Sequence, residues 1–398
     1  MPTNMAQYFS VYASPFRMTL LPPDLSPVIR ANLRRIAAQR LRWPDEPATV
    51  TPLAGDASNR RYFRLTASSG DASASAILML LADPEGFKAS EEAVSRSAPP
   101  VTELPFMNIW RHLNSRGLPV PDVYHYEPRE GWLLLQDLGD RLLSQAVQHQ
   151  PPQIVKELYH QAIEELVRLQ TAGSSPADPG CLAFGRAFDD ALLMWEFDHF
   201  VEYGIEARRG AVLDPAHREA LRAAFRPIVS ELAGQPRCFT HRDYHSRNLM
   251  LHQDRIWLLD FQDALLGFPQ YDLASLLRDS YISLPDELID GLLDDYFQLS
   301  ERAGRRIDDP ASFRRLFDLA SVQRNLKAAG RFVYIDRVKH NPNFLPAIPR
   351  TLANVRANCR RYTELKPLAE LLVPLVPELS EPSGATPSPS PTPVKDRP

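Results

Sequence analysis

Three short apolar segments, each bounded by turn-forming residues, lie in the first third of the chain. They cover residues 62–65, 76–81 and 132–135, and this pattern is typical of β-strands. Residues 103–116, between the second and third segments, have the spacing of a helix that ends at Gly117. The pattern therefore predicts a small mixed sheet accompanied by a helix.

Helical periodicity dominates the rest of the chain. Residues 154–167 repeat apolar positions at helical spacing ahead of Gly173, which is typical of an amphipathic helix. Further helices are predicted over residues 29–40, 189–203, 214–232, 286–303, 311–329 and 349–370, with one strand-rich segment over residues 237–261. We expect an α+β protein with a small β-rich lobe and a larger, mainly helical lobe.

The length of 398 residues also favours two lobes, because a chain of this size exceeds a typical single core. We expect an irregular extension over residues 1–22, an N-lobe over residues 23–139, a helical C-lobe over residues 140–379 and a tail over residues 380–398. The tail is rich in Pro, Ser and Thr, so it has little to bury and is predicted to be disordered.

Composition excludes several classes of protein. With 45 Lys+Arg against 49 Asp+Glu, the chain has no basic field for a nucleic acid. Cys181, Cys238 and Cys359 are isolated, with no CxxC spacing that could build a zinc site. No apolar run approaches the length that spans a bilayer, and the first residues lack a signal-peptide pattern. We expect a cytoplasmic protein that binds neither nucleic acid nor membrane.

The segment over residues 239–261, FTHRDYHSRNLMLHQDRIWLLDF, places three polar residues beside strand-like apolar runs. Phosphoryl transfer needs such residues, because positioning and charge neutralisation supply most of its catalysis. Asp243 is the expected catalytic base, which orients the attacking hydroxyl and takes its proton. Asn248 and Asp260 offer the hard oxygen ligands that Mg²⁺ prefers while it bridges the phosphates of ATP.

The combination of residues in this motif makes coincidence remote. An Asp followed five residues later by an Asn occurs by chance roughly once in a chain of this size. The preceding His241 and Arg242, and the strand that ends in Asp-Phe, make the combination far rarer. Two other interpretations stay open. In the first, Asp243, Asn248 and Asp260 only cap turns and strand ends. In the second, the loop belongs to a kinase relative that has lost its activity, but the intact base and metal pair argue against this interpretation.

The sequences HRDYHSRN and LLDF resemble the catalytic and metal-binding loops of protein kinases and, more closely, of the aminoglycoside phosphotransferase family. His245 favours the second family, and no APE-like segment of protein kinases is visible. The later segment GFPQYDLASLLRDSY is similar to one in which an acidic residue of that family, here Asp272, holds the catalytic loop. The resemblance implies a two-lobed, protein-kinase-like fold and the use of ATP and Mg²⁺.

On this scaffold the segment LAGDASNRRYFRL, over residues 53–65, lies where a phosphate-covering loop joins two strands. The candidates for phosphate contact, through backbone N–H groups or side chains, are Gly55, Ser58, Asn59 and Arg60. The strand end LLLQDLG looks like the hinge whose backbone receives adenine, which makes Gln136 and Leu138 nucleotide neighbours. Alternatively, the first segment is an ordinary polar hairpin, and the second is a plain linker between the lobes.

The next strand departs from the protein-kinase pattern. Protein kinases place a phosphate-binding lysine there, whereas the run SAILMLLADP has Met79 and no lysine. Either an arginine such as Arg60 or Arg64 compensates, or backbone donors and Mg²⁺ hold the phosphates. The sequence leaves both explanations open.

Five segments together resemble the AmgK-type sugar kinases of cell-wall recycling, over residues 31–365: GDASNRRYFRL, LLLQDLG, HRDYHSRNLM, LDFQDALLGFPQYDLASLLRDSY and QRNLKAAGRF. This resemblance implies phosphorylation of the anomeric hydroxyl of N-acetylmuramate and N-acetylglucosamine to α-1-phosphates, with hand-off to a sugar-1-phosphate uridylyltransferase. Glu196 and Asp198 are candidate sugar contacts, and Arg324 and Lys327 are candidate partners of a lactyl carboxylate. Alternatively, Glu196 and Asp198 lie on the solvent face of an amphipathic helix, and Arg324 and Lys327 are plain surface charges.

Two rival functions stay open. A kinase of another small alcohol, such as an aminoglycoside, choline or homoserine, would keep every catalytic residue and differ only in its acceptor pocket. A non-catalytic nucleotide-binding regulator is supported by the missing strand lysine. Magnesium-dependent ATP turnover would exclude the regulator.

Overall fold

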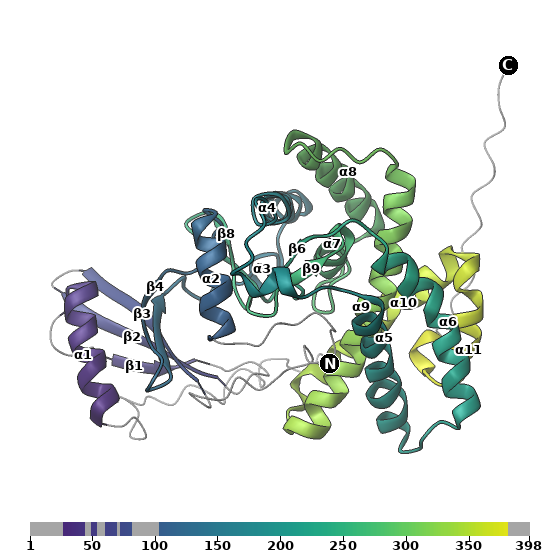
Figure 1. The fold of residues 1–398 in the computed structure, drawn as a ribbon, viewed down its shortest axis with the longest axis horizontal. Coiled ribbons are helices and arrows are strands. Elements are labelled where there is room, and N and C mark those ends of the chain that lie inside the picture. Colours follow the sequence, from purple (N-terminus) through teal and green to yellow (C-terminus); the bar gives the residue numbers. More distant parts are fainter. Residues whose placement is uncertain (1–26, 44–48, 54–59, 70–71, 82–102, 381–398) are drawn as a thin grey trace, which may run out of the picture. The chain divides into compact units, whose positions relative to one another are not determined.

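The computed structural model describes residues 27–43, 49–53, 60–69, 72–81 and 103–380 (Figure 1). The chain divides into two compact units. Within the described residues the smaller unit combines one sheet with one helix, and the larger unit holds most of the helices and two short strand pairs. This division agrees with the predicted α+β class.

The sheet of the smaller unit is antiparallel, with the spatial order β1-β2-β3-β5-β4. Its strands are β1 (Thr49–Pro52), β2 (Arg61–Ser69), β3 (Ala72–Leu80), β4 (Val123–Glu127) and β5 (Trp132–Gln136). The three predicted segments lie in β2, β3 and β5, whereas β1 and β4 are short polar strands that the pattern did not reveal. The sheet is not mixed, since connections as short as the one between β2 and β3 can join only antiparallel neighbours.

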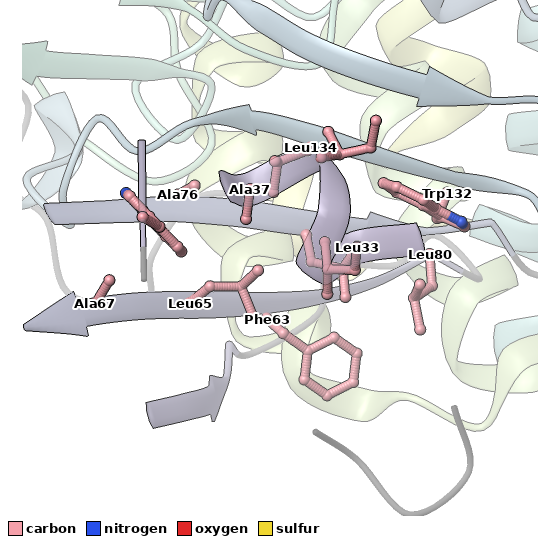
Figure 2. Packing of buried hydrophobic residues seen from close by; sticks show 12 residues of the cluster. Leu33, Ala37, Phe63, Leu65, Ala67, Ala76, Leu80, Trp132 and Leu134 are labelled. Atoms are coloured by element: carbon pink, nitrogen blue, oxygen red, sulfur yellow. The ribbon is translucent and has the colours of Figure 1, made fainter. Parts of the chain in front are cut away.

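Helix α1 (Pro27–Leu41) packs on one face of this sheet (Figure 2). Leu33 of the helix and Leu65 of β2 belong to one buried apolar cluster. Because side chains alternate across a strand, Arg64 of β2 and Met79 of β3 face the opposite side of the sheet. Met79 lies in register with Tyr62 and is itself fully buried.

Helix α2 (Pro105–Ser115) belongs to the larger unit, whereas the sequence placed residues 103–116 within the predicted N-lobe. Its contacts explain the difference. The ring of Phe106 lies 4.9 Å from that of Phe261, and Asn108 Nδ2 donates to the carbonyl of Gly180 at 2.8 Å. Buried polar groups need such partners, and those of α2 lie in the larger unit.

The larger unit is mainly helical among its described residues (Figure 1). Besides α2, its helices are α3 (Leu143–Ala146), α4 (Pro152–Thr171), α5 (Asp190–His199), α6 (Pro215–Ala233), α7 (Pro269–Leu277), α8 (Asp286–Arg302), α9 (Pro310–Lys339), α10 (Ile348–Arg361) and α11 (Lys366–Leu372). Short turns of other helix types are η2 (Leu182–Gly185), η3 (Phe200–Ala207), η4 (Pro342–Ala347), η5 (Thr363–Leu365) and η6 (Pro377–Leu379). Two strand pairs join β6 (Cys238–Thr240) to β9 (Leu265–Gly267) and β7 (Leu249–His252) to β8 (Arg255–Leu258). No helix in the described ranges is long and apolar enough to cross a membrane.

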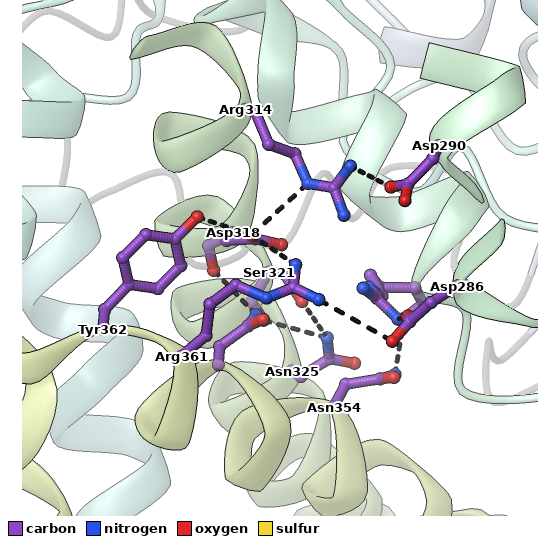
Figure 3. A network of polar contacts seen from close by, with 11 residues as sticks. Asp286, Asp290, Arg314, Asp318, Ser321, Asn325, Asn354, Arg361 and Tyr362 are labelled. Atoms are coloured by element: carbon purple, nitrogen blue, oxygen red, sulfur yellow. Dashed lines mark hydrogen bonds and ion pairs between the residues drawn. The ribbon is translucent and has the colours of Figure 1, made fainter. Parts of the chain in front are cut away.

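Helix α9 contacts α5, α7, α10 and the π-helical turn η3, so its position governs much of the unit. Gly330 permits a close approach to η3, because a Cβ there would lie 2.8 Å from the Cα of Phe200. A polar network joins α9 to α8 and α10 (Figure 3). The fully buried Asp318 of α9 accepts hydrogen bonds from Arg361 at 3.0 Å and from the Tyr362 hydroxyl at 2.8 Å. Buried polar groups with good partners hold an element in one register.

Candidate active site

The β7–β8 hairpin brings the two predicted metal ligands to the same end of one supersecondary unit. Leu249 and Leu258 are register partners in this antiparallel pair. The backbone N–H of Leu259 donates to the carbonyl of Asn248 at 2.9 Å, and Asp260 follows directly. Asn248 and Asp260 are twelve residues apart in the sequence, and the local hairpin, rather than packing between distant segments, brings them together.

Asn248 and Asp260 are held in ways that suit a hard cation. Asn248 is 5% exposed, and its Nδ2 donates to the backbone carbonyl of Asp243 at 3.0 Å, which leaves the amide oxygen as its remaining polar atom. Asp260 has a φ of 61° and accepts a hydrogen bond from Gln262 Nε2 at 2.9 Å. A left-handed backbone at a non-glycine residue costs about 1 kcal/mol or more and often marks a functional site. One amide oxygen and one carboxylate fit Mg²⁺, which takes few protein ligands and keeps waters.

Asp272, in the first turn of α7, holds the start of the loop that follows β6 and carries Asp243. Its carboxylate accepts the backbone N–H of His241 at 2.6 Å and that of Arg242 at 3.0 Å. Arg242 has a φ of 78°, so these bonds support a strained backbone. Asp272 is fully buried, and burial raises its pKa to about 7 although the two N–H donors favour the carboxylate.

A second acid, which the sequence interpretation missed, holds the middle of the same loop. Asp279 is 1% exposed and accepts the backbone N–H of Ser246 at 3.0 Å. Its sequence signal was present, because Asp279 follows Asp272 by seven residues in the segment DLASLLRDS. Asp272 and Asp279 together hold the start and the middle of the loop that carries Asp243.

Asp243, the acid carried by this loop, is more accessible than the two acids that hold the loop. Its side chain is 35% exposed, and its Oδ1 lies 3.7 Å from the Nζ of Lys327 on α9. Burial acts to raise the pKa of Asp243, but the positive charge of Lys327, with contributions from His245 and Arg242, holds that pKa well below its usual range. The carboxylate is thus ionised and available as a hydrogen-bond acceptor at neutral pH.

Glu196, predicted as a sugar contact, is instead engaged by two side chains of the protein. Its side chain is fully buried, and Oε1 accepts a hydrogen bond from Arg242 Nη2 at 2.8 Å. Its other oxygen accepts from Gln323 Nε2 of α9 at 2.8 Å. Both carboxylate oxygens are committed to the protein, so Glu196 supports the catalytic loop through Arg242.

Two further predicted acceptor contacts, Asp198 and Arg324, also have partners within the larger unit. Asp198 pairs with Arg222 of α6 at 2.7 Å; burial raises its pKa, and Arg222 offsets part of that effect. Arg324 is 5% exposed, and its Nη1 lies 3.4 Å from the hydroxyl of Ser280. The structure therefore brings together Asp243, Asn248, Asp260 and Asp272. Asp198 instead pairs with α6, whereas the charge of Arg324 acts to lower the pKa of Asp272.

The predicted nucleotide residues lie in the smaller unit, where Gly55, Ser58 and Asn59 fall outside the described residues. Arg60, the first residue after that gap, is half-buried. At the other segment, Gln136 Oε1 accepts the backbone N–H of Asp122 at 3.1 Å, and Leu138 is 5% exposed.

Arg64 is one of the two arginines considered as a substitute for the missing lysine, and it is hydrogen-bonded to residues that follow β5. Its Nε donates to Asp137 Oδ2 at 2.7 Å and its Nη2 to Asp137 Oδ1 at 3.0 Å. The same Nη2 contacts the carbonyl of Gly139 at 3.1 Å. This bidentate pair ties β2 to the residues after β5, and Arg64 therefore acts in the structure of the predicted hinge.

Comparison with known proteins gives a consistent result. A family model described as the phosphotransferase enzyme family matches residues 49–311. The chain is similar to a protein of Neisseria meningitidis serogroup B named N-acetylmuramate/N-acetylglucosamine kinase: the two are 32% identical over 346 residues, which is 86% of this chain and 96% of the relative.

Two solved structures resemble the fold. A choline kinase from Cryptosporidium parvum Iowa II has a TM-score of 0.55 and 12% identity, over 85% of this chain and 99% of that one. The streptomycin–ATP ternary complex of the aminoglycoside phosphotransferase APH(2″)-IIa has a TM-score of 0.54 and 12% identity, over 87% of this chain and 99% of that one. Both likenesses support the predicted fold, a small β-rich lobe and a mainly helical one, although the sheet is antiparallel and not mixed as the sequence predicted.

Proposed function

The chain belongs to the phosphotransferase enzyme family, and we propose that it is an ATP-dependent kinase of the anomeric hydroxyl of N-acetylmuramate and N-acetylglucosamine. The observation that carries this proposal is the similarity, over 86% of the chain, to a kinase named for these two sugars. ATP as donor is supported by the similar phosphotransferase structure that contains ATP. The choice of the C1 hydroxyl rests on the resemblance of the motifs to anomeric kinases.

Asp243 acts as the catalytic base in this proposal. Its carboxylate accepts the hydrogen bond of the acceptor hydroxyl and so aims the oxygen at the γ-phosphorus. The bond between that oxygen and the γ-phosphorus forms while the bond from phosphorus to the β–γ bridging oxygen breaks. ADP leaves with the bridging oxygen, and the acceptor proton passes to Asp243. The partial exposure and ionised state of Asp243 support this role.

Asn248 and Asp260 are the proposed ligands of Mg²⁺. When bound, the cation neutralises charge on the phosphates and favours their in-line arrangement. The chain itself holds the two ligands at one end of the β7–β8 hairpin and directs the Asn248 amide nitrogen to the protein. This arrangement spares the amide oxygen for the cation.

The product of the proposed reaction is a sugar α-1-phosphate. Such a phosphate is a good substrate for a nucleotidyl transfer that forms a nucleoside diphosphate sugar. We therefore place a sugar-1-phosphate uridylyltransferase next in the reaction sequence. Because an acidic sugar and a neutral one are both proposed acceptors, the site must tolerate a lactyl carboxylate without requiring it.

A direct test is ADP release with ATP and Mg²⁺ over a panel of N-acetylmuramate, N-acetylglucosamine, glucose, kanamycin and choline. Asp243→Asn is the variant without the proposed base, and Asp254→Asn, at the exposed turn between β7 and β8, is the matched control. Phosphorus NMR of the product distinguishes a 1-phosphate from phosphates at other hydroxyls. A 1-phosphate on both N-acetyl sugars, formed far more slowly by Asp243→Asn alone, supports the proposal.

Other outcomes of this assay are equally informative. Phosphorylation of choline or kanamycin alone keeps the kinase and overturns the acceptor. A 6-phosphate product keeps the sugar and overturns the anomeric hydroxyl. An absence of ADP release with every acceptor favours the non-catalytic regulator, for which the buried Met79 at the expected lysine position is the supporting observation.

A further inference from the structure

Two residues of α9, one helical turn apart, reach the loop that carries the proposed base. Gln323 donates to Glu196, which in turn holds Arg242. Four residues later, Lys327 places its Nζ 3.7 Å from Asp243 Oδ1. Residues at i and i+4 share one face of a helix, so a single face of α9 supports two consecutive residues of the loop.

The environment of Lys327 makes its charge effective. Its side chain is 12% exposed, so solvent screens the pair less than an ion pair on the surface. Throughout the described residues, Asp243 is the partner with which Lys327 forms an ion pair. A buried ammonium needs such a counter-charge, and the long polar network around Asp318 keeps α9 in place to provide it.

The distance between the two groups decides the kind of interaction. At 3.7 Å the pair is electrostatic and exceeds the range of a good hydrogen bond. Lys327 therefore attracts the carboxylate without occupying a lone pair through a short hydrogen bond. The carboxylate is held in one orientation and still accepts the hydrogen bond of an acceptor hydroxyl.

A carboxylate base beside ATP also faces repulsion from the phosphates. In phosphoryl transfer the transferred group carries charge on its equatorial oxygens, and the acceptor oxygen must approach it next to the anionic base. A positively charged side chain beside the base, here that of Lys327, lowers this repulsion in the transition state. The same cation contributes little to the ground-state affinity for a neutral sugar.

We propose that Lys327 is the positioning residue for Asp243, a cation that orients the base and offsets its repulsion of the transferred phosphoryl group. This inference rests on the proposed kinase function and gives Lys327 a role different from binding a lactyl carboxylate. A positioning residue of this kind affects kcat for every acceptor. A carboxylate-binding residue affects KM for N-acetylmuramate and spares N-acetylglucosamine.

The test compares Lys327→Met, Lys327→Arg, Asp243→Asn and the double variant Lys327→Met/Asp243→Asn, with steady-state kinetics on both sugars. Lys366→Met, at a position 75% exposed, is the matched control. We expect Lys327→Met to lower kcat about 10- to 100-fold on both sugars with little change in KM, which is less than the roughly 100- to 10,000-fold that a general base itself contributes. Lys327→Arg should recover most of the loss, and Lys366→Met should behave as the wild type.

The double variant shows whether Lys327 affects kcat through Asp243 or in some other way. If Lys327 works through the base, Lys327→Met has no further effect on kcat in the Asp243→Asn background. An equal loss in both backgrounds overturns the proposal, as does a rise in KM confined to N-acetylmuramate. Thermal unfolding of each variant provides a second readout: if the fall in kcat tracks a loss of folded protein, the role is structural and the proposal fails.

Failure of the proposed function has a different signature. A wild type that phosphorylates choline or kanamycin but neither sugar overturns the acceptor assignment alone, and the Lys327 comparison is then read on that alcohol. A wild type that phosphorylates both sugars, with a kcat unchanged by Lys327→Met, overturns the positioning role alone.

Discussion

Arg242 donates from Nη2 to Glu196 Oε1 at 2.8 Å, and the two side chains are only 5% and 0% exposed. The arginine comes directly before the proposed base, and the glutamate comes from α5. Removing one partner of a buried ion pair leaves an uncompensated charge in the protein interior, which is costly. This pair therefore links the stability of the helical unit to the geometry of the catalytic loop.

Glu196→Ala should destabilise the protein by about 3–5 kcal/mol, because it leaves the Arg242 guanidinium buried and unpaired. Urea unfolding measures the change. Glu219→Ala is the matched control, since its pair with Arg226 is exposed on both sides and is worth about 1 kcal/mol or less. A normal unfolding curve for Glu196→Ala with a raised KM for the sugar would return Glu196 to the acceptor pocket.

Asp272→Ala should lower kcat strongly, because the backbone N–H groups of His241 and Arg242 both lose their acceptor. Each buried donor left without a partner costs about 1–3 kcal/mol. Asp272→Asn keeps one acceptor oxygen and should lie between the wild type and Asp272→Ala. Kinetics together with thermal unfolding measure both effects. Equal activity of the three proteins would contradict a supporting role for Asp272.

Asp260→Asn should raise the Mg²⁺ concentration needed for half-maximal activity, since an amide is a weaker ligand than a carboxylate for a hard cation. We expect a rise of about tenfold or more, by analogy with the effects of altering metal-site residues. Activity titrated with Mg²⁺ measures it. Asp254→Asn, at the exposed turn of the same hairpin, is the control, and an unchanged Mg²⁺ requirement in Asp260→Asn would exclude Asp260 as a ligand.

His241 should make the protein less stable in acid. Burial lowers the pKa of His241 to about 4, whereas an unfolded histidine titrates near about 6.5. Between these two values the unfolded state binds a proton that the folded state does not, so the free energy of unfolding falls as pH falls. The total loss is about 3 kcal/mol, and it is absent above about pH 7.

His241→Gln removes this proton-linked loss. Urea unfolding at about pH 7 and about pH 4.5 should show a smaller difference between the two pH values in the variant than in the wild type. His217→Gln, at an exposed helix start, is the matched control. The same pH difference in wild type and His241→Gln would show that other groups cause the loss in acid.

The local parts of the site were predictable because short stretches of sequence determine them. Asn248 and Asp260 meet through one hairpin, whose two apolar strands and intervening turn lie within a single segment. The helix of residues 286–303 was predicted from periodicity and appears as α8. Two short polar strands, β1 and β4, escaped prediction because they lack an apolar run and gain their partners only in the sheet.

The roles of distant side chains were decided by tertiary structure. Glu196 and Asp198 have the same charge and lie two residues apart, so the sequence offered no reason to separate them. In the fold, Glu196 is buried against Arg242, whereas Asp198 pairs with Arg222 on the other side of α5. A two-residue step turns a side chain by more than half a helical turn, and packing decides which side faces the catalytic loop.

The sequence by itself determined the family of chemistry, since a base, an amide and a carboxylate at these spacings suit phosphoryl transfer on a two-lobed scaffold. The resemblance of the motifs pointed to Asp272 as one support of the catalytic loop, and the structure shows the two N–H groups that it accepts. Only the tertiary structure revealed Asp279 and Lys327, which contact the loop directly, and Gln323, which acts on it through Glu196. Such contacts depend on how helices pack across long sequence separations, and no local pattern of apolar and polar residues specifies that packing.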